Sequence, residues 1–226
     1  RDFIANVSHE LKTPLTVVAG FSEMLADNYE DYGDAEIRHY LTLICEQNGR
    51  MQRLIEDLLT LSSLESGGAL ANEERVDIEP MLRSILAEAQ ALSGGKHDIA
   101  LSIEAPSVLA GCANELRSAF GNLVGNAVRY TPPGGKIDLI WRVRNGCGEF
   151  AVADTGIGIA AQHLPRLTER FYRVDRSRSR ETGGTGLGLA IVKHVLTRHQ
   201  ASLEIESELG KGSRFVARFA RHRLVS

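Results

Sequence analysis

The chain has 226 residues, which is enough for one large domain or two modest ones. A hydrophobic content of 43% and a charged content of 24% are ordinary for a globular protein, and a net charge of -3 argues against nucleic-acid binding by the molecule as a whole. The three cysteines are scattered without CxxC spacing, so the sequence indicates neither a disulfide framework nor a structural zinc site, and a reducing cytoplasm is expected.

The start of the chain carries no membrane or export signal. No run approaches the roughly 18 apolar residues that a membrane-spanning helix needs, and no signal peptide is visible. The first residue is Arg1, and a helical pattern is already under way at Phe3. We therefore expect a cytoplasmic fragment without membrane contact of its own, cut from a longer protein in which anchors or sensor domains could precede it.

Residues 1–66 are predicted to form two long amphipathic helices, joined by a polar connection, Asp27–Glu36, that contains Gly33. Two such helices cannot bury their apolar stripes against each other alone, so a homodimeric four-helix bundle is predicted. Pro14 removes a backbone hydrogen bond within the first helix and should bend it. Apolar residues recur at spacings of three and four at Phe3, Val7, Leu11, Leu15 and Val18, then at Ile37, Leu41, Ile44, Met51, Leu54, Ile55, Leu58 and Leu61.

Residues 67–75 are predicted to be a linker, because they are small, polar and rich in glycine and alanine. Residues 76–226 form the second predicted domain, with an α+β fold in which helices cover one face of a mostly antiparallel sheet. Its helices are expected at 78–92, 114–130 and 190–199, and its strands at 99–104, 136–144, 148–156, 202–208 and 213–219.

The motif SHELKTP, which begins at Ser8, places His9 directly before Glu10. His9 is either an inconsequential surface residue or a nucleophile with a base beside it. The motif alone does not decide between these readings, so the rest of the chain must supply a reaction partner.

The stretch NLVGNAVRY, Asn122–Tyr130, places Asn122 and Asn126 on one face of an apolar helix. The two amides either serve local polar packing or supply an oxygen ligand for Mg²⁺. Arg129 offers a cation for phosphate, and Tyr130 offers a flat stacking surface.

The stretch DTGIG, Asp154–Gly158, is either a common turn or a ligand-binding loop. A carboxylate there could accept a hydrogen bond from an exocyclic amine such as that of adenine, while the glycines let a ligand approach the backbone.

Two further stretches lie close together in the sequence. Residues 169–181 hold Phe171 and several arginines, and read either as a solvated basic loop or as a lid from which an arginine reaches a phosphate. Residues 183–193, GGTGLGLAIVK, open a helix whose free N–H groups would face an anion. This stretch matches neither a Walker A loop nor a dinucleotide-binding fingerprint.

In this order, the five motifs resemble the H, N, G1, F and G2 boxes of the sensor histidine kinases of two-component systems. The resemblance covers essentially the whole chain. It implies a dimerisation and phosphotransfer domain, followed by an α/β sandwich ATP-binding domain of the gyrase, Hsp90, histidine kinase and MutL type. Residues 164–194 also look like the phosphate-regulon sensor kinases, whose parent proteins are anchored in the inner membrane.

The resemblance implies that His9 is the phosphoacceptor, that Glu10 orients and deprotonates it, and that Arg173 reaches the γ-phosphate of ATP. Phosphate then passes to an aspartate of a response-regulator receiver domain. Thr13 matches the family position for a water that dephosphorylates the regulator, so a bifunctional kinase and phosphatase is expected.

For the nucleotide, the resemblance implies Asn126 as the Mg²⁺ ligand with Asn122 behind it, Arg129 on the phosphates, Tyr130 stacked on adenine and Asp154 on its amino group. Further nucleotide contacts are implied for Gly156, Gly158, Gly184, Thr185, Gly186, Leu187 and Gly188.

The sequence departs from the family pattern in two places: Cys112 stands where aspartate is common, and Gln200 and Ala201 stand where glycines are common. These departures concern local geometry rather than chemistry. Two other functions are possible: a docking platform that holds ATP and signals mainly by conformation or regulator dephosphorylation, and a chaperone or DNA-topology ATPase of the same superfamily. The intact His9, Glu10, Asn126 and Asp154 argue against the first, and SHELKTP on a helical hairpin argues against the second.

Overall fold

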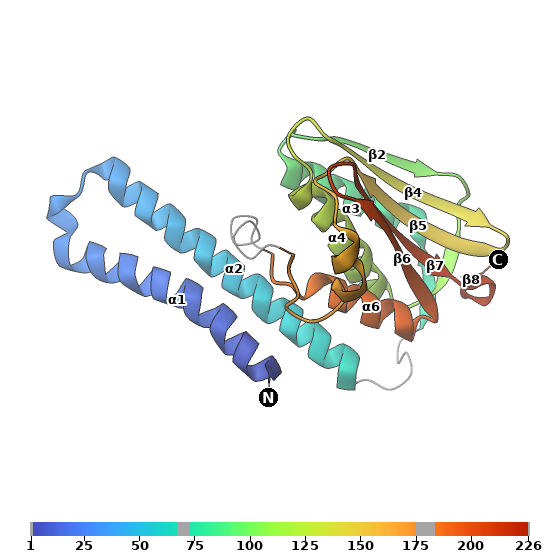
Figure 1. Cartoon of the computed structure of the whole chain (residues 1–226), viewed down its shortest axis with the longest axis horizontal. Helices are drawn as coiled ribbons and strands as arrows, with labels where there is room; N and C mark the ends of the chain where they lie inside the picture. Colours follow the sequence, from blue (N-terminus) through green and yellow to red (C-terminus); the bar gives the residue numbers. More distant parts are fainter. Residues whose placement is uncertain (1, 67–72, 175–183, 226) are drawn as a thin grey trace.

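The computed structural model describes residues 2–66, 73–174 and 184–225 (Figure 1). The N-terminal part is a helical hairpin of α1 (Asp2–Asn28) and α2 (Asp34–Ser66), joined by the short 3-10 helix η1 (Tyr29–Asp31). This confirms the two predicted helices and places the connection within the predicted range. Helix α1 continues through Pro14, which is buried.

Aromatic side chains close the end of the hairpin where the chain reverses. The rings of Phe21 and Tyr40 stack with centroids 5.2 Å apart, and Tyr32 meets Tyr40 edge to face at 5.5 Å. The backbone N–H of Gly33 donates to the Glu36 carboxylate at 3.1 Å, which satisfies a donor near the start of α2.

The C-terminal part is a helix layer on a sheet, as predicted. The large sheet has the order β2-β4-β5-β7-β6, in which β2 and β4 are parallel and the other neighbours are antiparallel. A second, small sheet has the order β1-β3-β8. The strands are β1 (Glu74–Asp77), β2 (Asp98–Ile103), β3 (Val108–Gly111), β4 (Lys136–Arg144), β5 (Cys147–Asp154), β6 (Ala201–Glu208), β7 (Gly212–Phe219) and β8 (Leu224–Val225).

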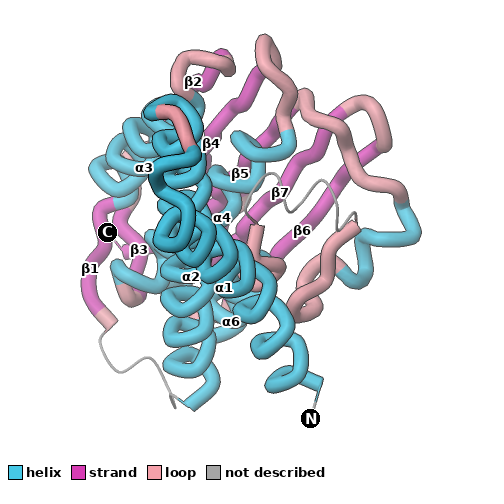
Figure 2. The backbone as a smooth tube through the Cα atoms, turned by 90° about the vertical axis from the view of Figure 1, so that its left-hand side faces the viewer, coloured by secondary structure: helices cyan, strands magenta, loops and turns pink. Residues whose placement is uncertain are grey.

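Three helices cover the face of the large sheet that looks toward the hairpin (Figures 1 and 2). They are α3 (Ile78–Ser93), α4 (Ala113–Tyr130) and α6 (Gly188–Arg198). Two 3-10 helices, η2 (Ala161–Arg166) and η3 (Arg221–Arg223), lie in the connections. Helix α2 packs beside α6, so the hairpin lies against the helix layer and not against the sheet.

The core lies between this helix layer and the large sheet. Along β4, alternate residues Ile137, Leu139 and Trp141 are fully buried, as the period of a strand requires when one face is covered. On α4, Phe120 is also fully buried, and its ring lies 4.4 Å from that of Phe150 on β5. This packing fixes α4 against β5, and the loops that follow these two elements form the candidate site.

The predicted helices and long strands are confirmed, with ends shifted by one or two residues. The short strands β1, β3 and β8 were not predicted. Strand β1 begins at Glu74, within the stretch assigned to the linker. Between residues 2 and 225, leaving out the undescribed segments 67–72 and 175–183, no helix is long and apolar enough to cross a membrane.

Candidate active site

A cavity of about 590 Å³ lies where α4, the loop after β5, the start of α6 and helix α2 meet. Its size is within the range of roughly 300–1,000 Å³ that is usual for ligand pockets. Most of the residues predicted to contact nucleotide line it. They are Asn122, Asn126, Arg129, Tyr130, Asp154, Gly158, Arg173, Gly184, Thr185, Gly186 and Gly188.

Helix α4 supplies one wall of the cavity through its last two turns. Asn122 and Asn126 both line it, so the spacing of four does place them on one face. The amide nitrogen of Asn122 donates to the Ser118 carbonyl at 3.0 Å, which orients the amide oxygen toward Gly188. Burial lowers the pKa of Arg129. A cation that has already lost part of its hydration in this way loses little more when it pairs with a phosphate.

Asp154 lies at the end of β5, where it accepts hydrogen bonds from one backbone N–H of the loop that follows and from one of the neighbouring strand β7. Its Oδ1 accepts the N–H of Gly156 at 2.8 Å and that of Ser213 at 3.3 Å. Burial raises the pKa of Asp154, and these two hydrogen bonds oppose the shift. A Cβ on Gly156 would lie 2.5 Å from the backbone oxygen of Tyr130, so only glycine allows this close approach.

The glycine-rich loop before α6 is tied to Phe171. The N–H of Phe171 donates to the carbonyl of Gly186 at 2.8 Å, and both residues have positive φ, +62° and +74°. A Cβ on Gly188 would lie 2.5 Å from Asn122 Oδ1. The loop therefore packs closely on α4, and its residues Gly184, Thr185, Gly186 and Gly188 line the cavity.

Leu187 and Gly156 do not line the cavity. The Leu187 side chain is fully buried in the core, and its N–H donates to the Thr185 hydroxyl at 3.2 Å. Gly156 acts on the cavity through Asp154. Three arginines of the predicted lid, Arg176, Arg178 and Arg180, lie outside the described residues, as does Gly183, the first residue of the glycine-rich stretch.

His9 lies on α1 with 77% of its side chain exposed, and it does not line the cavity. Its Nδ1 is 4.0 Å from Glu10 Oε1, so it faces the expected base but is beyond hydrogen-bond distance. The Thr13 hydroxyl donates to the His9 carbonyl at 3.3 Å, one turn further along the helix.

Arg173 connects the His9 region to the cavity. The other oxygen of Glu10, Oε2, pairs with Arg173 at 3.4 Å and with Arg50 of α2 at 3.3 Å. Since Arg173 also lines the cavity, the expected base and the expected phosphate-binding arginine are bound to each other in this structure.

Helix α2 contributes residues that the sequence did not single out. Arg53, Glu56 and Asp57 line the cavity, and Asp57 Oδ2 accepts a hydrogen bond from the Thr185 hydroxyl at 2.6 Å. Arg50, Arg53 and Asp57 are spaced by three and four residues, so they lie on one face of the helix. This spacing of charged residues is the sequence pattern that could have identified them as site residues.

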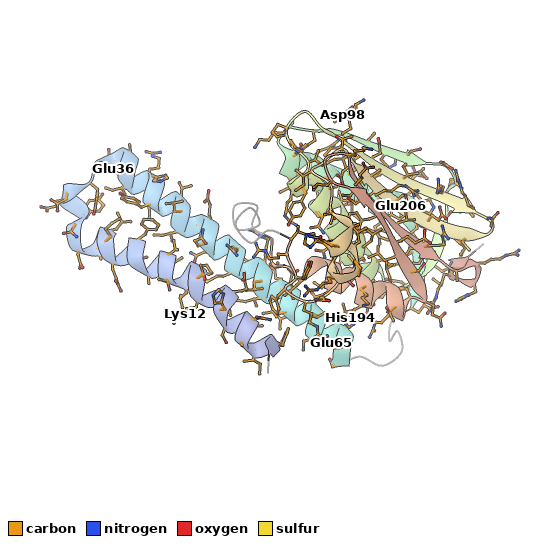
Figure 3. All side chains as sticks on the ribbon, viewed as in Figure 1. Lys12, Glu36, Glu65, Asp98, His194 and Glu206 are labelled. Atoms are coloured by element: carbon orange, nitrogen blue, oxygen red, sulfur yellow. The ribbon has the colours of Figure 1, made fainter. Side chains whose placement is uncertain are left out.

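The hairpin is also held at its open end. Glu65 near the end of α2 pairs with Arg170 and lies 3.5 Å from Nε2 of His194 on α6 (Figure 3). A guanidinium nitrogen of Arg198 donates to the Leu64 carbonyl at 3.3 Å, and the rings of Phe3 and Phe171 lie 5.8 Å apart. These contacts hold the hairpin against the C-terminal part, next to the α2 residues Arg53, Glu56 and Asp57 that line the cavity.

Comparison with known families identifies both parts of the chain. Residues 1–67 match the His Kinase A (phospho-acceptor) domain, and residues 111–223 match the histidine kinase-, DNA gyrase B-, and HSP90-like ATPase family.

Curated relatives and solved structures agree with this assignment. The phosphate regulon sensor protein PhoR of Pseudomonas aeruginosa is 54% identical over 97% of this chain and 50% of its own length. The sensor-like histidine kinase SenX3 of Mycolicibacterium smegmatis is 40% identical over 95% of this chain and 56% of its own length. The chain thus spans about half the length of these relatives. Full-length ShkA in complex with AMPPNP aligns with a TM-score of 0.71 and 29% identity, over 100% of this chain and 46% of ShkA.

Proposed function

The chain belongs to the sensor histidine kinases as an ATP-dependent catalytic core, and we propose that it transfers the γ-phosphoryl group of ATP to His9. One observation carries the proposal: Arg173 joins the two halves of the reaction. It lines the cavity and pairs with Glu10, the residue next to His9. Arg173 therefore joins the nucleotide cavity to Glu10, the residue next to the proposed phosphoacceptor His9.

We propose that ATP binds with adenine at Asp154 and Tyr130 and with its phosphates toward Arg129 and the loop at Gly186. The free oxygen of the Asp154 carboxylate would accept a hydrogen bond from the amino group of adenine, while the backbone donors hold Oδ1. This assignment places the anionic end of the nucleotide beside a partly desolvated arginine and a helix start.

We assign Asn126 as the protein ligand of a Mg²⁺ ion. Its amide lines the cavity beside Asn122 and Arg129, and amide oxygen is a donor that Mg²⁺ accepts together with phosphate oxygens and water. When bound, the ion would neutralise charge on the phosphates during transfer.

In the transfer step, Nε2 of neutral His9 attacks the γ-phosphorus. The new N–P bond forms as the bond to the β-phosphate bridging oxygen breaks, and ADP leaves. The Nδ1 proton passes to Glu10, whose Oε1 is the carboxylate oxygen that faces Nδ1. His9 is exposed and does not line the cavity, and Arg173 is paired with Oε2 of Glu10, so we infer that His9 and the nucleotide site must approach each other before transfer.

We further propose that two copies of the hairpin form a four-helix bundle. Ile4, Leu15, Leu41 and Leu59 are at least half exposed on one chain, and a second hairpin would bury them. Phosphate would pass from His9 to the aspartate of a receiver domain, with Thr13 serving the reverse, phosphatase reaction. The similarity to PhoR supports phosphate-starvation signalling by a longer, membrane-anchored parent.

Labelling with γ-³²P-ATP and Mg²⁺ tests the proposed function. The chain should take up acid-labile, alkali-stable label that is absent from His9→Ala. His39→Ala is the matched control, because His39 is also an exposed histidine of the hairpin, on α2. This variant should take up as much label as the wild type. Equal labelling of His9→Ala and the wild type would refute the assignment, as would label that resists acid.

A further inference from the structure

An acidic side chain of the hairpin occupies part of the nucleotide cavity. Asp57 projects from α2, and its Oδ2 accepts the Thr185 hydroxyl at 2.6 Å. The same hydroxyl oxygen accepts the N–H of Leu187 at 3.2 Å, just before α6 begins at Gly188. The Thr185 hydroxyl oxygen thus links Asp57, by two successive hydrogen bonds, to the loop proposed to hold the phosphates.

The surroundings of Asp57 are those that a phosphate group would need. Burial raises the pKa of Asp57, while the hydrogen bond from Thr185 and the charge of Arg129 oppose the shift. Arg129 is itself partly desolvated, and Arg53 lines the same cavity. The Asp57 carboxylate therefore lies near two arginines and a hydroxyl at the end of the cavity assigned to an anion, and the neighbouring charge of Glu56, which raises the pKa of Asp57 further, adds to the negative charge there.

We propose that Asp57 is an acidic latch, which holds α2 against the nucleotide site and must leave when the phosphates of ATP enter. The proposal rests on the function proposed above. Both anions cannot share the same few cations and the Thr185 hydroxyl, so nucleotide binding and hairpin docking oppose each other. ATP thereby frees α2 at the moment when His9 has a phosphate to receive.

The affinity for ATP should depend on the fraction of molecules in which α2 is undocked. If the docked state must open before ATP binds, the apparent dissociation constant equals the intrinsic one divided by the open fraction. A variant that weakens docking through Asp57 raises this fraction and tightens ATP binding. Other contacts, such as those of Glu65 with Arg170 and His194, remain in such a variant, so the gain is limited.

A metal-binding role for Asp57 predicts the opposite sign. If its carboxylate were a ligand of Mg²⁺, its removal would weaken Mg²⁺–ATP binding. The contacts of Asp57 are a hydroxyl donor and guanidinium charges, which favours the latch.

Calorimetric titration of the whole chain with Mg²⁺–AMPPNP tests the latch. Asp57→Ala removes both contact and charge, and Asp57→Asn removes the charge but keeps the shape. We expect both to bind AMPPNP roughly five- to thirtyfold more tightly than the wild type, within the usual range of coupling between linked sites. Glu46→Gln, which neutralises an exposed carboxylate on the same helix, is the control and should stay within about twofold. Unchanged or weaker binding by both Asp57 variants would overturn the proposal.

Adenosine, which has no phosphate, provides a second arm of the experiment. We expect its affinity to change less than about twofold in Asp57→Ala, because the latch opposes phosphates and not the base. An equal gain for adenosine and AMPPNP would contradict competition with phosphates. If the wild type bound no AMPPNP at all, the proposed function would be contradicted. If the wild type bound AMPPNP and the two Asp57 variants bound it with the same affinity, only the latch would be contradicted. Thermal unfolding confirms that each variant is folded.

Discussion

Replacing Asp154 separates nucleotide recognition from the stability of the loops around it. In Asp154→Asn, the amide oxygen can take the place of Oδ1 and still accept the N–H groups of Gly156 and Ser213. The amide nitrogen then stands where the second carboxylate oxygen was, and it cannot accept a hydrogen bond from the amino group of adenine.

The two effects have different magnitudes. Loss of a hydrogen bond to a charged group costs about 1.5–3 kcal/mol, so ATP should bind roughly 10- to 150-fold more weakly to Asp154→Asn. The free energy of unfolding should change by less than about 1 kcal/mol, because both backbone donors stay paired. Asp154→Ala leaves the N–H groups of Gly156 and Ser213 without this acceptor and should cost about 1–3 kcal/mol of stability as well.

Titration with Mg²⁺–AMPPNP and urea unfolding measure these effects. Inosine triphosphate adds a direct check, because its base carries a carbonyl oxygen where adenine carries the amino group. The new amide of Asp154→Asn can donate to that oxygen, so the preference for ATP over inosine triphosphate should shrink or reverse. Wild-type ATP affinity and an unchanged preference in Asp154→Asn would refute the assignment of Asp154 to the base.

Three further predictions concern other parts of the chain. Gly156→Ala should weaken AMPPNP binding at least tenfold in titration, because its Cβ would lie 2.5 Å from the Tyr130 oxygen; wild-type affinity would show that the loop can shift freely. Thr13→Ala should keep autophosphorylation and lose regulator dephosphorylation in matched assays, and equal loss of both activities would contradict its role. His199 is fully buried, and burial lowers its pKa, so the folded state binds fewer protons than the unfolded state and stability should decrease as pH falls below about 6.5. Urea unfolding at pH 7.5 and 5.5 measures this, and a decrease just as large in His199→Gln would assign it to other groups.

The sequence predicted the parts of the fold in which the signal is local and repeated. The two hairpin helices have long apolar stripes, and β4 alternates between buried and exposed residues over its first half, so both elements were predicted. Strands β1, β3 and β8 have two to four residues, too few to show alternation, and they form only because distant segments pair.

In the candidate site, too, residues in a local pattern were predicted and residues that depend on long-range contacts were not. Asn122, Asn126 and Tyr130 share one helix face, and Asp154 ends a strand, so local pattern sufficed to place them on the cavity. Leu187 lies between Gly186 and Gly188 in the sequence, but its side chain is buried in the core at the start of α6, so only its backbone is left to contact a nucleotide. The contact between Asp57 and Thr185 joins residues 128 positions apart, and it depends on how the hairpin docks, which no local pattern encodes.

The position of the phosphoryl group on the protein tests the central claim most directly. After reaction with Mg²⁺–ATP, mass spectrometry should locate phosphate on the peptide that carries His9, and ³¹P nuclear magnetic resonance should assign it to Nε2. This result is predicted because Nδ1 faces Glu10, which leaves Nε2 free to attack. Phosphate on Nδ1 of His9, or on any other residue, would contradict the account.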